Sequence, residues 1–168
     1  MNYFTLFEIP VSLKVNASEI LKKYYVLSRQ HHPDNYTLAS DAEQEESEKM
    51  TTRINQAKLI LENPTKRLAY ILQEKGLISD DEKQQLSPQF LGEMMDINEQ
   101  LMELEFEPDV EIMNKVKDEI NHIERKIYAE VELYFLQDEL KLTDGDGVKL
   151  KEYYFKQKYI QRIKEKLI

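Results

Sequence analysis

Apolar residues recur at helical spacing along most of this chain. Between residues 16 and 31 the stripe consists of Ile20, Tyr24, Leu27 and His31. A second stripe over residues 50–61 repeats at the same intervals of three and four. Such spacing puts the side chains on one face of an α-helix. Asn16, followed three residues later by Glu19, has the form of a capping box and predicts where the first helix begins.

The two stripes are separated by His32-Pro33-Asp34 and a polar stretch. Pro33 disfavours helix at His32, so the chain is expected to turn there. Residues 35–47 are rich in Thr, Ser, Asp, Glu and Gln and are expected to form an exposed loop. Two antiparallel helices joined in this way would present the tripeptide at the tip of a hairpin.

Three more apolar stripes follow Pro88, over residues 90–104, 113–134 and 150–167. Their members are again three or four residues apart, with Gln157 as the one interruption of the last stripe. Three amphipathic helices that each bury one face against the other two form a three-helix bundle. The expected fold class is therefore all-α, with a helical hairpin followed by a bundle.

Composition supports helices and leaves little room for a cofactor. Of 168 residues, 33% are charged and only 4 are Gly, which suits helices better than sheets. No cysteine is present, and three histidines are too few for a convincing metal cage. The acidic turn that begins at Asp144 is no calcium loop, because Val148 and Lys149 stand where an EF-hand needs a ligand and a Gly. No cofactor or metal is expected.

Charge is spread unevenly along the chain. Residues 1–75 hold 10 Lys and Arg against 10 Asp and Glu, so the whole net charge of −9 lies in residues 76–168. A nucleic-acid partner needs a basic face and is therefore not expected. The contrast between the two parts suggests two units with different surfaces.

No stretch predicts membrane insertion or export. The first residues lack the basic start and apolar run of a signal peptide. No uninterrupted apolar run is long enough to span a bilayer. We expect a cytoplasmic protein with no membrane partner.

Taken alone, His32-Pro33-Asp34 could be only a helix end and a turn, since Pro and Asp are common there. The segments on either side of the tripeptide favour a different interpretation. With Tyr3-Phe4-Thr5-Leu6-Phe7 upstream and Asn63-Pro64-Thr65-Lys66-Arg67 downstream, residues 1–75 resemble a J-domain, the module that drives ATP hydrolysis in DnaK-type chaperones.

This resemblance implies a chaperone-binding site. In J-domains the His-Pro-Asp loop and the basic helix face before it contact the ATPase domain and linker of the chaperone. The matching positions here are His32, Pro33 and Asp34, with electrostatic support from Lys22, Lys23 and Arg29. One position departs from the family, because Asn35 stands where Lys is usual. A missing rim charge mainly alters association rate and salt dependence.

The first helix of the expected bundle carries more apolar surface than its core stripe uses. By helical geometry Leu91, Met95 and Met102 fall outside the stripe, about 100–140° from it, with acids beside them. The last helix has a similar surplus in Val148, Phe155 and Tyr159. These residues either form a partner-binding surface or pack on the J-domain or within a thick bundle, and both interpretations remain open at this stage.

A J-domain followed by a three-helix bundle, in a chain of this length, resembles the HscB family of iron–sulfur cluster assembly co-chaperones. The resemblance implies a J-domain over 1–75, a connector over 76–87 and a bundle over 88–168. In that family the chaperone is HscA, and the bundle binds the cluster scaffold IscU. The matching positions for the scaffold are Leu91, Met95, Asp96, Glu99, Glu103 and Phe155. Gly92 stands where an apolar residue is often found.

The resulting hypothesis is a co-chaperone that delivers IscU to HscA and stimulates its ATPase, without being an enzyme itself. One alternative is a J-domain co-chaperone with a different client. The other is a hydrolase that uses His32, Asp34 and carboxylates of the bundle. It is disfavoured because no nucleophile, metal set or phosphate-binding Gly loop accompanies those residues.

Overall fold

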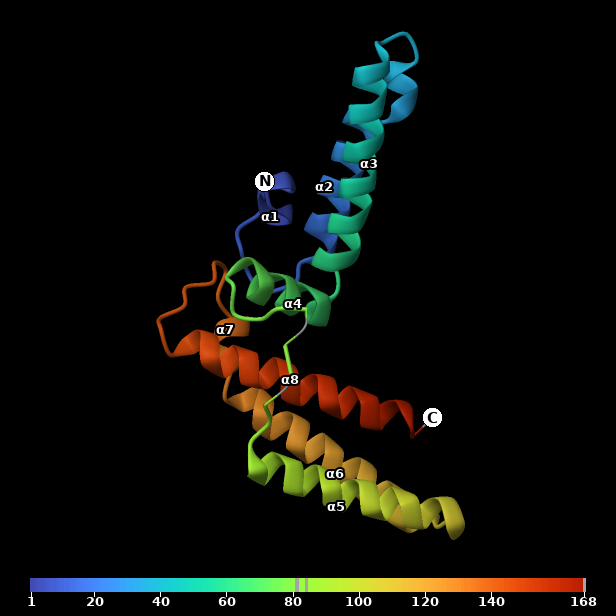
Figure 1. Cartoon of the computed structure of the whole chain (residues 1–168), viewed down its shortest axis with the longest axis vertical. Helices are drawn as coiled ribbons and strands as arrows, with labels where there is room; N and C mark the ends of the chain where they lie inside the picture. The colour runs from blue at the N-terminus through green and yellow to red at the C-terminus, as the bar shows by residue number, and fades with distance from the viewer. Residues whose placement is uncertain (81, 84, 168) are drawn as a thin grey trace. The chain divides into compact units, whose positions relative to one another are not determined.

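The computed structural model describes residues 1–80, 82–83 and 85–167, and this part of the chain contains helices and no strand. The expected all-α fold is confirmed. Contacts divide the chain into two compact units (Figure 1). The first comprises residues 1–74 and 134–141, and the second comprises 75–133 and 142–168. Within the described ranges, no helix has the length and apolarity needed to cross a membrane.

The first unit is built on a two-helix hairpin. Its elements are α1 (Tyr3–Leu6), α2 (Ala17–Gln30), the 3-10 helix η1 (Pro33–Tyr36), α3 (Asp41–Leu61) and α4 (Pro64–Glu74). Helices α2 and α3 lie side by side, and η1 lies at the tip where they are joined (Figure 1). The expected hairpin, with His32-Pro33-Asp34 at its tip, is therefore what the structure shows.

Capping side chains explain where the hairpin helices begin. Asn16 accepts a hydrogen bond from the Glu19 backbone N–H, as the sequence pattern predicts for α2. Helix α3 begins earlier than expected, because Ser40 and Glu43 form a reciprocal capping box. The exposed loop expected over 35–47 is therefore too long. Its acidic second half forms the first turns of α3, where negative side chains favour the helix N-terminus.

The N-terminal element, α2 and α3 each contribute buried apolar side chains to the first unit. Phe4, Leu6 and Phe7 of the N-terminal element are buried. Helix α3 contributes its predicted stripe at Ile54, Ala57 and Leu61. On α2 only Ile20 is fully buried, while Tyr24, Leu27 and His31 are half-buried. Helix α2 therefore keeps a large part of its surface free.

Residues 134–141 return to the first unit. The Leu140 N–H donates to the Val11 carbonyl at 2.7 Å, and the Ser12 hydroxyl donates to the Gln137 carbonyl at 2.8 Å. Leu140 itself is buried. The sequence pattern gave no sign of this return, since the ranges expected from it assign the whole of 88–168 to the bundle.

The second unit is a helical bundle. Helices α5 (Pro88–Phe106) and α8 (Asp146–Glu165) both pack on α6 (Val110–Ala129). The short α7 (Glu132–Phe135) follows α6, so the helical stripe expected over 113–134 is broken after residue 129. The core consists of Phe90, Met94, Ile97, Leu104, Val116, Ile120, Ile123, Ile127, Ile160 and Ile163.

Polar contacts account for two irregular positions of the bundle. Gln157, which interrupts the last stripe, donates to the Glu124 carboxylate at 3.3 Å. The Asp146 carboxylate accepts hydrogen bonds of 2.7 Å from both the backbone N–H and the hydroxyl of Thr143. The turn before α8 therefore uses this acid to hold its own backbone.

Truncation of a side chain should affect stability strongly on the buried face of α5 and weakly on its exposed face. Ile97 is 0% exposed within the bundle core, so Ile97→Ala should lower the free energy of unfolding by about 2–5 kcal/mol. Met95, two residues away and 61% exposed, is the matched control, and Met95→Ala should change it by less than about 0.5 kcal/mol. Denaturant unfolding of both variants measures the difference. Equal losses would contradict this assignment of the two faces.

Candidate functional site

The end of α2 is held by side chains of α3. His31 caps the helix, and its backbone N–H donates to the Leu27 carbonyl at 3.0 Å. The His31 carbonyl accepts hydrogen bonds from the Ser47 hydroxyl at 2.8 Å and from the Thr51 hydroxyl at 3.0 Å. Ser47 is buried. The backbone immediately before the His-Pro-Asp turn is thus attached to the neighbouring helix rather than left free in solvent.

The turn itself is a single 3-10 turn capped by His32. The Nδ1 atom of His32 accepts a hydrogen bond from the Asp34 N–H at 3.2 Å, and the His32 carbonyl accepts one from the Asn35 N–H at 3.0 Å. Pro33 occupies the first helical position, where its missing N–H leaves no donor unsatisfied. The backbone around the tripeptide is therefore ordered by local hydrogen bonds.

The side chains of this turn face solvent. The Asp34 side chain is 86% exposed, and His32 is exposed as well. The Asp34 carboxylate lies 3.5 Å from the His32 Nδ1 atom. This contact is an ion pair only when the ring is protonated, whereas the hydrogen bond from the Asp34 N–H needs an unprotonated Nδ1. Both groups remain accessible to a partner in either state.

Asn35 has a role that sequence reasoning missed. Its side-chain amide donates to the carbonyl of Arg29, in the last turn of α2, at 2.7 Å. This carbonyl belongs to the group that a helix end leaves without intrahelical partners. Asn35 therefore ties the turn back to α2, at the position where J-domains usually carry Lys.

The basic face of α2 carries less unpaired positive charge than its sequence suggests. Lys22 and Arg29 are exposed, but the Lys23 ammonium lies 3.0 Å from the carboxylate of Glu8. Glu8 has a φ of 52°, a left-handed conformation that is uncommon for a residue with a side chain. Of the three predicted cations, Lys22 and Arg29 supply most of the charge that this face offers.

A buried arginine connects α4 with the segment that leads into α2. Arg67 is buried and donates to the Lys14 carbonyl, and its guanidinium lies 5.9 Å from the centre of the Phe4 ring. Burial lowers the pKa of Arg67 to about 10. Within the described part of the chain, its Nε atom has no hydrogen-bond partner. We interpret Arg67 as an anchor for residues 12–16.

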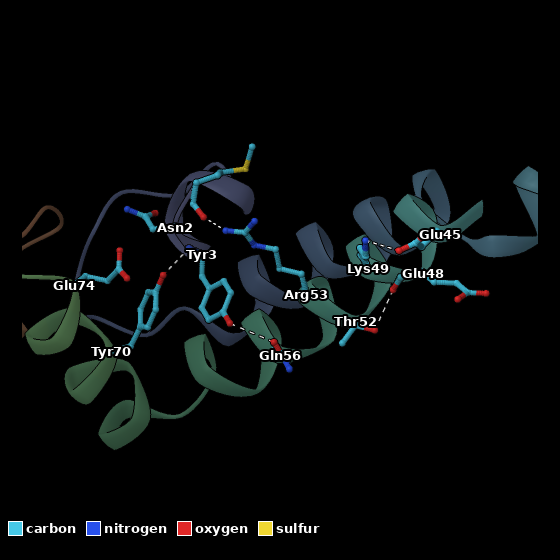
Figure 2. Close-up of a pocket in the computed structure, with 11 residues that line it drawn as sticks. Asn2, Tyr3, Glu45, Glu48, Lys49, Thr52, Arg53, Gln56, Tyr70 and Glu74 are labelled. Atoms are coloured by element: carbon cyan, nitrogen blue, oxygen red, sulfur yellow. Dashed lines mark hydrogen bonds and ion pairs between the residues drawn. The ribbon is translucent and has the colours of Figure 1, made fainter. Parts of the chain in front are cut away.

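One cleft of the first unit lies between helices. It has a volume of about 860 Å³ and lies where α1 meets α3 and α4 (Figure 2). Tyr3 stacks on Tyr70 with ring centres 4.7 Å apart, and its N–H donates to the Tyr70 hydroxyl at 3.0 Å. Burial raises the pKa of Tyr70. Arg53 donates to the Met1 carbonyl. The polar groups here bond mainly to one another, which favours a structural role over a ligand site.

The second candidate site is the outer face of α5. Leu91, Met95 and Met102 are exposed there, as the partner-surface interpretation requires. The three acids proposed to act with them are also exposed: Asp96, Glu99 and Glu103. This helix therefore presents an apolar strip with carboxylates beside it.

The proposed contribution of α8 is different. Phe155 is only 6% exposed, so it is not part of an open surface in this structure. Tyr159 is half-buried and meets Phe90 edge-on, with ring centres 6.1 Å apart. Val148 is exposed. The surplus on α8 is thus mostly packed, because aromatic side chains in this position find neighbours that the sequence pattern does not show.

Among the residues whose positions the structure gives, no three or more His, Cys, Asp or Glu side chains gather in a way that could hold a metal ion. The described side chains form two exposed surfaces: a turn in one unit and an apolar, acidic strip in the other.

Comparison with known proteins identifies two family domains in this chain. Residues 2–70 match the DnaJ domain family, and residues 86–168 match the HscB C-terminal oligomerisation domain family. The crystal structure of human co-chaperone protein HscB superposes with a TM-score of 0.77 at 29% identity, covering 99% of this chain and 80% of the other. For chaperone HscB of Vibrio cholerae the TM-score is 0.80 at 25% identity, with 99% and 95% covered. The fold and its turn define a J-domain co-chaperone.

Curated relatives specify the family. The co-chaperone protein HscB homolog of Neisseria meningitidis is 31% identical over 138 residues, which cover 82% of this chain and 83% of the relative. The homolog of Vibrio cholerae is 28% identical over 171 residues, with 100% and 99% covered. The chain belongs to the HscB family of co-chaperones, as the sequence resemblance predicted.

The Asn35 bond to α2 leads to a test of loop order. Asn35→Ala removes the donor to the Arg29 carbonyl, so amide hydrogen exchange over residues 32–36 should become several-fold faster. Global stability should fall by only about 0.5–1.5 kcal/mol, the net contribution of one hydrogen bond. Gln30→Ala, at a neighbouring exposed position, is the control and should leave exchange in the turn unchanged. Unaltered exchange in Asn35→Ala would show that the amide does not hold the turn.

Proposed function

We propose that this protein acts in iron–sulfur cluster assembly by delivering an IscU-type scaffold protein to a DnaK-type chaperone of the HscA kind. The observation that carries the proposal is the combination of two exposed surfaces in one chain. One is the ordered His-Pro-Asp turn at the tip of the α2–α3 hairpin. The other is the apolar and acidic strip of α5.

The turn supplies the chaperone-binding site in this proposal. His32 and Asp34 project into solvent from a backbone that is held by α3 and by Asn35. A partner therefore meets side chains whose backbone is already ordered, which lowers the entropic cost of binding. Exposed Lys22 and Arg29 act mainly on the association rate with an acidic chaperone surface.

The α5 strip supplies the scaffold-binding site. Met95 is unbranched and flexible, so it adapts to an irregular partner surface. Asp96, Glu99 and Glu103 provide polar contacts around the apolar side chains and orient a partner with basic groups. Phe155 is excluded from this surface as long as it stays buried.

Two binding sites in one chain suffice for the proposed activity. Binding of the scaffold by the second unit raises its effective concentration near a chaperone held by the first unit. ATP hydrolysis takes place on the chaperone, and this chain contributes contacts rather than chemistry. A preparation of this protein without chaperone should therefore show no ATP turnover.

Asp34→Asn tests the chaperone site. The substitution removes the carboxylate but keeps the backbone N–H that bonds to His32, so the turn should stay folded. Steady-state ATPase of the cognate chaperone should lose its stimulation, while scaffold binding stays unchanged. Asp41→Asn, an exposed acid in the first turn of α3, is the matched control and should stimulate normally. Normal stimulation by Asp34→Asn would refute the J-domain role of this turn.

The same assay tests the client. In the wild type, scaffold and this protein together should stimulate the chaperone more than the sum of their separate effects. Stimulation that ignores the scaffold would keep the J-domain role and point to a different client protein.

Leu91→Ala combined with Met95→Ala tests the scaffold site. Truncating two exposed apolar contacts should weaken scaffold binding several-fold, measured by titration calorimetry, with little change in the free energy of unfolding. Leu133→Ala, an exposed apolar truncation on α7, is the control and should bind normally. A large loss of stability in the double variant would mean that these side chains belong to the core.

A further inference from the structure

The exposed apolar strip of α5 continues beyond the residues assigned to the scaffold. Met102 is exposed, and Phe106, the last residue of the helix, is 87% exposed. At 100° per residue, Leu91, Met95, Met102 and Phe106 lie within an arc of about 60°. From Leu91 to Phe106 the strip runs for about 22 Å along the helix.

The strip also continues round the turn into α6. Val110 and Ile112 in its first turn are exposed. Phe106 and Ile112 line one cleft of about 480 Å³ at this turn, together with Pro108. A phenylalanine left almost fully in water, next to other exposed apolar side chains, is typical of a protein-binding surface.

The charge along this segment of the chain is of one sign. From residue 89 to residue 114 the chain has eight Asp and Glu and no Lys or Arg. The cleft at the turn is itself lined by Glu103, Glu107 and Asp109. An occupant must therefore bring basic groups together with apolar ones. A second copy of this chain fits poorly, because symmetric contact at this face would bring the same acids together.

We propose that the scaffold-binding surface covers the whole length of α5 and the start of α6, with Phe106 as an anchor at its far end. Its occupant is a segment of the scaffold protein about 20 Å long, in which Lys or Arg alternates with apolar side chains. The inference rests on the proposed function. The added contact residues are Met102, Phe106, Val110 and Ile112. The acids at this end select a scaffold segment that carries positive charge.

Phe106→Ser tests the extension by calorimetric titration with the purified cognate scaffold. Because the side chain is exposed, the variant should fold normally and bind about ten-fold more weakly, the size expected for an aromatic anchor. Leu133→Ser is the matched control, since Leu133 is an exposed apolar residue of the same unit on a different helix. It should bind like the wild type.

Charge is tested separately at Glu107. Glu107→Gln should lower the affinity for the scaffold at low ionic strength and reduce its dependence on salt, because one carboxylate no longer attracts the basic segment. The affinities of variant and wild type should approach one another at high salt. An unchanged salt dependence would overturn the proposed basic character of the occupant.

The experiment separates this inference from the proposed function. If Leu91→Ala with Met95→Ala weakens binding and Phe106→Ser does not, the extension is wrong and the scaffold site stands. If the wild type does not bind the scaffold, both are wrong. Analytical ultracentrifugation of the wild type should not reveal a dimer whose formation depends on Phe106, that is, one that is lost in Phe106→Ser. Such a dimer would make a second copy the occupant and overturn the proposal.

Discussion

The termination of α2 is the constraint on which the His-Pro-Asp end of the hairpin depends. Pro33 disfavours helix at His32, so the chain must leave the helical path there. The carbonyl of His31 would then be an unpaired acceptor, and Ser47 and Thr51 of α3 satisfy it. The same two hydrogen bonds attach the end of one helix to the next. A turn with exposed functional side chains is thereby given an ordered backbone.

Helix α5 combines a buried face that stabilises the bundle with an exposed apolar face. Its stripe from Phe90 to Leu104 fills the bundle core, and large-to-small changes there are costly. The apolar residues outside that stripe contribute little to folding, because they stay in water. These apolar side chains remain exposed to water, and acidic side chains on the same side of the helix keep the surface from being purely apolar. Such a division allows the binding face to vary without loss of the fold.

Sequence reasoning found the parts of the protein that follow from local rules. The cap at Asn16, the turn at Pro33 and the periodic stripes each depend on neighbours within a few residues. The site positions around the turn were inferred from the resemblance to J-domains. Helical geometry placed Met95 outside the core stripe, and Met95 is exposed. The capping box at Ser40 is also a local signal, but it was overlooked. The loop expected over residues 35–47 was therefore longer than the one in the structure.

Only the tertiary structure decided which of the named side chains are accessible. Three findings depend on packing that periodicity does not encode. They are the ion pair between Lys23 and Glu8, the burial of Phe155, and the return of residues 134–141 to the first unit. Asn35 illustrates the same point, since its bond to Arg29 exists only once the turn has folded back. The sequence by itself determined the helices, the turn and the family. Long-range packing determined which charges and apolar groups remain free, because that depends on neighbours brought together by folding.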